Sequence, residues 1–407
     1  MSARIPLSEL GDVTVLTEPA GGVPRVTATS EALDHLCEAL RSGSGPVAAD
    51  AERASGYCYG QSTYLVQLKR HGAGIALIDP VALPDLSPVA AAVGGAEWIL
   101  HAASQDLQGF AEHGIVPATL FDTELAGRLL GLPRVGLASM VAEFLGLGLA
   151  KEHSAVDWSR RPLPADWLRY AALDVEVLIE LRHAMEERLD AAGKLTWARQ
   201  EFAAELTAPT PPPRVDPWRR TSGIGSIKNR RTLAIVRELW LARDASARER
   251  DIAVGRVLPD KAILAAAGAR PRTTAQLIRI TEFSGKGQRR RAPYWQEAIS
   301  TALRLPESAL PPVRGPRPDG PPPHRNWGSR KPEAAARLEA ARAFVAEESE
   351  RLAIPVENLL EPDALRRLCW SPPRDVTSNS VASALRSRRA REWQVDLLAA
   401  GLAQAIG

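Results

Sequence analysis

The stretch Val47-Ala-Ala-Asp50-Ala-Glu52 decides the fold of the first half of the chain. Three small or apolar residues, typical of a buried strand, run directly into two acidic residues that are spaced two apart. Because side chains alternate between the faces of a strand, the two carboxylates point to the same side. Close carboxylates repel each other unless a cation neutralises them. On its own the pair is more simply explained as a strand-end turn, so a functional interpretation depends on the other motifs.

The residues around this stretch alternate between strand-like and helix-like patterns. Apolar runs predict strands at 47–49, 64–68, 75–78 and 98–100, and helical periodicity predicts helices at 30–40, 107–113, 123–130, 137–145 and 167–189. Three strands followed by alternating strands and helices indicate an α/β domain, with a mixed sheet and flanking helices.

Proline-rich stretches divide the rest of the chain. Residues 208–217 hold five prolines and residues 306–332 hold nine. Since proline neither continues a helix nor donates a hydrogen bond to a sheet, both stretches are expected to be linkers. The predicted organisation is an α/β domain at 1–205, a linker at 206–221, a small all-helical domain at 222–305, a linker at 306–329 and a second small all-helical domain at 330–407.

The two helical blocks resemble each other. Ile252-Ala-Val-Gly-Arg-Val-Leu258 aligns with Ile354-Pro-Val-Glu-Asn-Leu-Leu360 at an offset of 102 residues. An offset this long indicates duplicated domains rather than a solenoid, whose repeats span about 20–50 residues. Chance similarity between apolar helices is the alternative.

Charge is divided unevenly along the 407 residues. Residues 1–200 hold 16 Lys and Arg against 25 Asp and Glu, whereas residues 201–407 hold 35 against 23. The balance suggests acidic groups for metal binding or catalysis and basic groups for a polyanion, although solvated surfaces would give the same counts. The three cysteines are scattered, which disfavours a disulfide framework or a zinc site. We therefore expect a cytoplasmic protein with no membrane partner.

Two further motifs in the first block carry acidic residues. Trp98-Ile-Leu-His-Ala-Ala-Ser-Gln-Asp106 leads from a strand into a helix, with Ser104 as the expected N-cap. Tyr170 and Asp174 are four residues apart on a predicted helix and so share one face. Each motif alone has a structural explanation, but together the three supply four carboxylates. Oxygen ligands of this kind favour Mg²⁺ or Mn²⁺, and paired ions of this kind recur in displacement at phosphorus.

Asp50-Ala-Glu52, His101-Ala-Ala-Ser-Gln-Asp106-Leu and Tyr170-Ala-Ala-Leu-Asp174-Val resemble the three exonuclease motifs of the DEDD superfamily, in its tyrosine-bearing branch. The run Asp157-Trp-Ser-Arg-Arg-Pro-Leu163 narrows the resemblance to ribonuclease D. The helical blocks resemble the helicase-and-RNase-D C-terminal (HRDC) domain, which that family can carry twice in tandem. The resemblance implies a ribonuclease H-like sheet, two divalent metal ions (Mg²⁺ or Mn²⁺), and 3′→5′ exonucleolysis that releases nucleoside 5′-monophosphates.

The resemblance also implies a role for each motif residue. Asp50, Glu52 and Asp174 would hold the metal ion that carries the attacking water. Asp50 would bridge to the second ion, which Asp106 would support directly or through water. Tyr170 would orient the nucleophilic water, because a phenol with an ordinary pKa of about 10 stays mostly protonated at pH 7.

Three residues beside the motifs are secondary candidates. Asp122 follows a strand-like run, and we expect it to be a helix N-cap that braces the site. His101 and Gln105 flank the second motif and could contact substrate. A buried, hydrogen-bonded histidine is the alternative for His101.

The first helical block holds the most basic segment. Residues 201–300 contain 19 Lys and Arg against 10 Asp and Glu, and the run 284–292 is expected to be flexible. The candidates for contact with nucleic-acid phosphates are Lys286, Arg289, Arg290 and Arg291. Tyr294 and Trp295, which follow, are expected in the core.

The sequence thus predicts a metal-dependent 3′→5′ exoribonuclease. By resemblance, its partners would be tRNA precursors and other structured RNAs with single-stranded 3′ tails. One alternative is a DNA-directed proofreading or repair exonuclease, since the carboxylate site barely distinguishes the two sugars. A second is a non-catalytic nucleic-acid-binding scaffold, against which the intact set of carboxylates argues. No small-molecule organic cofactor is expected.

Overall fold

The computed structural model describes residues 14–149, 156–210, 212–315 and 319–407. They form two compact units. Unit 1 comprises the chain up to Glu52, Thr63–Pro209 and Asp319–Gly407, and unit 2 comprises Arg53–Ser62 and Thr210–Pro318. The short segment Arg53–Ser62, which connects two strands of unit 1, therefore belongs with the first helical block.

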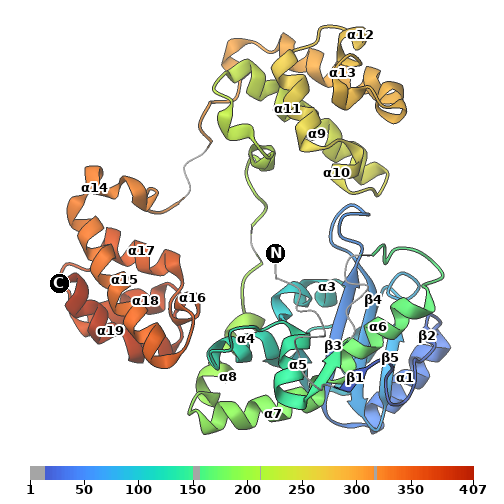
Figure 1. Ribbon diagram of the computed structural model, residues 1–407, viewed down its shortest axis with the longest axis vertical. Helices are drawn as coiled ribbons and strands as arrows, with labels where there is room; N and C mark the ends of the chain where they lie inside the picture. The colour runs from blue at the N-terminus through green and yellow to red at the C-terminus, as the bar shows by residue number, and fades with distance from the viewer. Residues whose placement is uncertain (1–13, 150–155, 211, 316–318) are drawn as a thin grey trace. The chain divides into compact units, whose positions relative to one another are not determined.

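A six-stranded sheet forms the centre of unit 1 (Figure 1). In spatial order its strands are β2 (Val26–Thr27), β5 (Gly74–Ile78), β4 (Thr63–His71), β3 (Ser44–Arg53), β6 (Glu97–Leu100) and β7 (Thr119–Asp122). β4 and β5 are antiparallel, whereas β2 with β5, β3 with β6 and β6 with β7 are parallel. The mixed sheet expected from the sequence is confirmed. A separate parallel pair joins β1 (Thr14–Leu16) to β8 (Leu147–Leu149).

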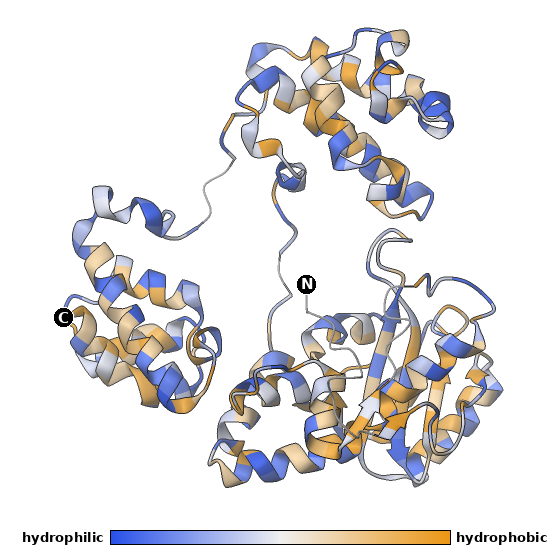
Figure 2. Cartoon of the chain, viewed as in Figure 1, coloured by the Kyte–Doolittle hydropathy of each residue, from blue (hydrophilic) through white to orange (hydrophobic). Residues whose placement is uncertain are grey.

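Helices flank this sheet: α1 (Ser30–Ser42), α2 (Ser87–Val93), α3 (Leu107–Glu112), α4 (Thr123–Leu129), α5 (Leu137–Leu145), α6 (Ala165–Glu176), α7 (Leu178–Ala191) and α8 (Leu195–Leu206). α6 packs on β4 and β5 (Figure 1). α7 packs on β6, and α8 packs on β7. Figure 2 shows hydrophobic residues concentrated on the strands and hydrophilic residues along the outer sides of the helices. The single helix expected at 167–189 is two helices, because a break at Val177 lets α6 and α7 pack on different strands.

The position of β3 in the centre of the sheet places the acidic residues at its end at one edge of the sheet. Val47, Ala48 and Ala49 are fully buried. Val47 lies beside Trp98 and Ala48 beside Ile99 on the parallel neighbour β6. Since the carboxyl ends of parallel strands meet at one edge of a sheet, the residues that follow β3, β6 and β7 gather at that edge.

The C-terminal helices share the hydrophobic core of unit 1. Trp197 on α8 stacks on Trp393, with ring centroids 4.8 Å apart. The buried Glu201, also on α8, accepts hydrogen bonds from the guanidinium of Arg391 and from Trp393 Nε1. These helices are α14 (Trp327–Arg330), α15 (Pro332–Leu352), α16 (Val356–Leu359), α17 (Pro362–Trp370), α18 (Ser378–Ser387) and α19 (Glu392–Ile406).

Unit 2 is built from helices around the buried Trp218 and Trp295. They are α9 (Arg230–Glu249), α10 (Val254–Val257), α11 (Asp260–Ala269), α12 (Thr274–Leu277) and α13 (Lys286–Arg304). The first three begin 102 residues before α15, α16 and α17, so the repeated pattern of the sequence corresponds to a repeated order of helices. Both blocks are all-helical in their described residues, as predicted.

The prediction of a flexible basic segment at 284–292 is wrong for most of its length. Helix α13 begins at Lys286. Ala292, Trp295, Ile299 and Ala302 are buried at helical spacing, and this apolar face fixes the basic residues on a helix. Among the described residues, no helix is both long and apolar enough to cross a membrane.

Substitution of Arg391 tests how firmly the C-terminal helices are attached to α8. The variant Arg391→Ala leaves the buried carboxylate of Glu201 without its cationic partner, so the free energy of unfolding should fall by about 3 kcal/mol. Urea unfolding followed by tryptophan fluorescence measures the change. Arg388→Ala, at an exposed position of the same segment, is the matched control and should change stability by less than about 0.5 kcal/mol. Equal stability of the two variants would contradict the attachment described.

Candidate active site

Three of the predicted carboxylates meet at one point of unit 1. One carboxylate oxygen from each of Asp50, Glu52 and Asp174 lies within 4.8 Å of the other two. Glu52 is buried, with 8 % of its surface exposed, and Asp50 and Asp174 are half-buried. Three negative charges this close, partly removed from water, raise the free energy of the ionised site unless cations are present.

The local structures that bring these groups together are the ones that the motifs predict. Asp50 and Glu52 are two residues apart on β3 and so lie on one face of the sheet. Asp174 and Tyr170 are one helical turn apart on α6. The opposite side of α6 is buried, and the helix packs across β4 and β5, which places its acidic face beside the end of β3.

Tyr170 lies in the electrostatic field of all three carboxylates. Burial is the largest cause that raises the pKa of its phenol, and the charges of Asp174, Glu52 and Asp50 raise it further. The phenol is therefore neutral and able to donate a hydrogen bond at any physiological pH. Its ring lies against the fully buried Trp158, with centroids 6.5 Å apart, and its hydroxyl is hydrogen-bonded to Asp174.

Asp106 lies close to this edge of the sheet but outside the group of three that meets within 4.8 Å. It is buried, with 5 % exposed, and stands between a 3₁₀ turn (Ala103–Gln105) and α3. The expectation that Ser104 is the N-cap is wrong. Ser104 lies within the 3₁₀ turn, and Asp106 occupies the cap position of α3 without making a capping hydrogen bond through its side chain, within the described part of the chain.

Asp122 is the N-cap of α4, as predicted, and its carboxylate also binds the backbone of the turn after β6. Its carboxylate accepts from Leu125 N at 3.0 Å in α4, and also from Ala102 N at 3.2 Å and Ala103 N at 2.7 Å. Ala102 has a left-handed backbone, with φ 61° and ψ 54°, which costs a non-glycine residue about 1–3 kcal/mol. Asp122 thus holds a strained turn four residues before Asp106.

His101 and Gln105 differ in how accessible they are. His101 is half-buried, and its Nδ1 lies 2.9 Å from Thr123 Oγ1, the hydroxyl of which donates to Leu100 O. This contact occupies one of the two ring nitrogens, so it agrees with a structural role for His101 without excluding substrate contact. Gln105 is exposed on the 3₁₀ turn.

The four basic candidates in unit 2 do not all face solvent. Lys286, Arg289 and Arg290 are exposed in the first turns of α13. Arg291 is half-buried: its guanidinium donates to Ser246 Oγ and lies 5.1 Å from the ring of Trp295. Trp295 is fully buried, as expected, whereas Tyr294 is 42 % exposed and so lies outside the predicted core.

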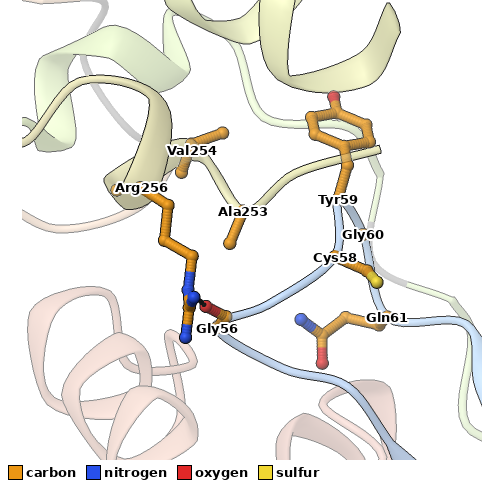
Figure 3. A pocket seen from close by; sticks show the side chains of 9 residues that line it. Gly56, Cys58, Tyr59, Gly60, Gln61, Ala253, Val254 and Arg256 are labelled. Carbon is orange, nitrogen blue, oxygen red and sulfur yellow. Dashed lines mark hydrogen bonds between the residues drawn. The ribbon is translucent and has the colours of Figure 1, made fainter. Parts of the chain in front are cut away.

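Unit 2 also contains a cavity of about 520 Å³, lined by residues of the segment Arg53–Ser62 and of the start of α10 (Figure 3). Arg256 Nε donates to Gly56 O at 2.6 Å, and the guanidinium lies 4.1 Å from the ring of Tyr57. Ala253 N donates to Tyr57 O at 2.8 Å. None of the clustered carboxylates lines this cavity, so we place the chemistry at the acidic cluster.

The donor set fits hard divalent cations. It consists of carboxylate oxygens, which Mg²⁺ and Mn²⁺ prefer, and no cysteine or histidine belongs to the group found among the described residues. The use of divalent metal is thus supported by the chemistry of the cluster itself.

Comparison with known proteins gives three family matches. A family described as 3′-5′ exonuclease matches residues 24–190, the HRDC domain matches 232–299, and a family described as 3′ to 5′ exonuclease C-terminal domain matches 320–406. The first two agree with the resemblances seen in the sequence. Because the last block matches under a different description, its assignment as a second HRDC domain stays a prediction.

Similar proteins cover most of the chain. Ribonuclease D of Escherichia coli K12 is 33 % identical over 70 % of this chain and 76 % of its own, and that of Granulibacter bethesdensis is 30 % identical over 87 % and 88 %. The crystal structure of Escherichia coli RNase D, described as an exoribonuclease involved in structured RNA processing, has 30 % identity and a TM-score of 0.65 over 89 % of this chain and 97 % of its own. A protein from Bifidobacterium adolescentis has 43 % identity and a TM-score of 0.88 over 97 % and 100 %.

A mixed sheet with an acidic cluster at the end of its central strand, followed by small helical domains, defines the class of 3′→5′ exonucleases. Within that class the chain belongs to the ribonuclease D family. It is a 3′→5′ exoribonuclease.

Metal binding can be tested without any nucleic acid. Addition of Mg²⁺ or Mn²⁺ to EDTA-treated protein should raise the melting temperature, since a ligand at a hundred times its dissociation constant stabilises the folded state by about 2.7 kcal/mol. Asp174→Asn should remove most of this shift, because it replaces one of the three clustered carboxylates. Asp166→Asn, in the first turn of the same helix, should keep it. An unchanged shift in Asp174→Asn would exclude Asp174 from the metal site.

Proposed function

We propose that this exoribonuclease works with two divalent ions, Mg²⁺ or Mn²⁺, and that Asp50, Glu52, Asp106 and Asp174 hold them. The mutual proximity of Asp50, Glu52 and Asp174 is the observation that carries the proposal. When bound, such ions lower the pKa of water and stabilise charge on the leaving oxygen. The product would be a nucleoside 5′-monophosphate.

In this proposal each side chain of the site has a role that follows from its position. Asp50, Glu52 and Asp174 form one ligand set, and Asp106, at the neighbouring strand end, completes a second set together with Asp50. The neutral hydroxyl of Tyr170 points the attacking water at the terminal phosphodiester. Its raised pKa supports this positioning role, since a neutral phenol donates a hydrogen bond and does not remove a proton.

We further propose that the substrates are structured RNAs with single-stranded 3′ tails, among them tRNA precursors. The printed description of the Escherichia coli relative, structured RNA processing, supports this substrate class. Lys286, Arg289 and Arg290 supply exposed positive charge in the HRDC-matching block and would contact RNA phosphates. His101 and Gln105 would contact the terminal nucleotides. A cytoplasmic location fits these substrates and belongs to the same proposal.

The proposed roles are tested on one 5′-labelled oligomer, made as RNA and as DNA, with a single-stranded 3′ tail. Wild-type protein with Mg²⁺ or Mn²⁺ should give a ladder that shortens from the 3′ end on RNA, and EDTA should abolish it. Asp174→Asn should lower kcat by more than 100-fold, since loss of an outer-shell partner alone costs about 10–100-fold. Tyr170→Phe should lower kcat by about 100-fold with an unchanged melting temperature, because its ring still packs on Trp158.

Two results would contradict this proposal. Normal turnover by Asp174→Asn would remove that residue from the chemistry. Equal or faster cleavage of the DNA oligomer would contradict the substrate class while leaving the metal site in place.

The basic residues are tested by the salt dependence of binding to the same RNA tail. Replacement of Lys286, Arg289 and Arg290 by Ala should reduce the slope of log K against log salt by up to about 2, since each single-strand phosphate contact contributes about 0.7. Arg304→Ala, near the other end of α13, removes one positive charge and should change the slope little. An unchanged slope in the triple variant would place RNA contact elsewhere.

A further inference from the structure

Glu205, whose side chain is half-buried, is neither a proposed metal ligand nor a proposed substrate contact. It lies near the end of α8, the helix that packs on β7 and α4. One of its oxygens, Oε1, accepts a hydrogen bond from Ser104 N at 3.0 Å. It thus binds the same strained turn that Asp122 binds through Ala102 N and Ala103 N. Three successive backbone N–H groups of this turn are therefore held by two acidic side chains.

The surroundings of the second oxygen of Glu205, Oε2, indicate that this carboxyl group is protonated. Oε2 is buried and, among the described residues, accepts no hydrogen bond. As part of a carboxylate it would be an unsatisfied negative atom, which is costly. As an O–H it can donate to the carboxyl of Asp122, which lies close enough for its charge to act on Glu205. Burial raises the pKa of Asp122 as well, but its carboxylate accepts three N–H donors, which favour its charged form. We therefore assign the shared proton to Glu205.

We propose that Glu205 and Asp122 are positioning residues that share one proton and together fix the turn Ala102–Ser104, so that Asp106 is presented to the second metal ion. The role of Asp106 is itself part of the proposed function, and the present proposal rests on it. Neither Glu205 nor Asp122 touches the substrate in this account. They act through the backbone, in which the left-handed Ala102 would relax if the hydrogen bonds were lost.

The surroundings of Glu205 make the shared proton sensitive to pH. Burial, the charge of Asp122 and, to a smaller extent, the charge of Glu124 in the first turn of α4 together raise the pKa of Glu205 to about 8. The arginines on elements packed against α8 have other partners: Arg128 pairs with Glu124, Arg182 with Glu97 and Glu186, Arg188 with Glu143, and Arg391 with Glu201. His183 on α7 is exposed. Above pH 8 the proton is lost, two adjacent carboxylates repel each other, and the turn should lose its support.

The discriminating variant is Glu205→Gln, whose amide keeps both an acceptor for Ser104 N and a donor for Asp122 but cannot ionise. The ratio of its kcat to that of the wild type cancels any pH dependence common to both enzymes. This ratio should stay near 1 below pH 7 and rise about eightfold between pH 7.5 and pH 9, as wild-type Glu205 loses its proton. Glu205→Ala, which loses donor and acceptor, should have a lower kcat at every pH with little change in KM.

Amide hydrogen exchange supplies a readout that needs no catalysis. At pH 7, Glu205→Ala should accelerate exchange at Ala102, Ala103 and Ser104, whereas Glu205→Gln should not. Exchange of the same amides in the wild type, corrected for intrinsic rates, should accelerate above pH 8. This comparison remains available if Glu205→Ala does not fold. It also separates the two proposals, because exchange can respond as expected even if the nuclease assay fails.

Glu201→Gln is the matched control, on the same helix one turn earlier. It weakens the contact with Arg391 and Trp393 and should lower the melting temperature, but it should alter neither the kcat ratio across pH nor exchange in the turn. A flat ratio for Glu205→Gln up to pH 9 would overturn the shared proton. Unchanged exchange of the three amides in Glu205→Ala, or above pH 8 in the wild type if that variant does not fold, would overturn the positioning role.

Discussion

Mutual repulsion among three carboxylates is the constraint on which the rest of unit 1 depends. Oxygens of Asp50, Glu52 and Asp174 lie within 4.8 Å of one another in a partly buried position. This arrangement does not stabilise the fold, since close charges of one sign are unfavourable when they are partly removed from water. The packing of the core must therefore offset the repulsion between the charges. Bound cations would neutralise the charges and stabilise the folded state.

Rigid elements supply that packing on both sides of the cluster. β3 enters the site through three fully buried residues in the middle of the sheet, Val47, Ala48 and Ala49. α6 is anchored by its buried face and by the aromatic contact of Tyr170 with Trp158. Each acidic group thus stands on a strand or helix with a buried opposite face, which fixes the distances between the groups.

Local geometry explains which parts of the site could be predicted from sequence. The pairs Asp50 with Glu52 and Tyr170 with Asp174 follow from the periods of a strand and a helix, so short spacings were enough to place each pair on one face. Asp122 was predictable as a helix cap because caps are also local. Whether the two pairs meet at one point depends on the order of the strands in the sheet. The alternating pattern predicted a mixed sheet but not that order.

The features that the sequence did not predict depend on contacts between residues far apart in the chain. Glu205 reaches Asp122 and Ser104 from a helix that no pattern in the sequence singled out, and its spacing from them carries no local signal. Arg291 was grouped with the exposed basic residues, but its contact with Ser246 on α9 turns it inward. Nor could the sequence show that Arg53–Ser62, directly after Glu52, belongs with the first helical block.

The most direct test of the central claim is anomalous scattering from crystals soaked with Mn²⁺ and a nucleoside 5′-monophosphate. The account predicts two manganese peaks, one coordinated by Asp50, Glu52 and Asp174 and a second at Asp50 on the side of Asp106. Peaks elsewhere, or none at these residues, would show that the carboxylates gather for another reason and would contradict the account.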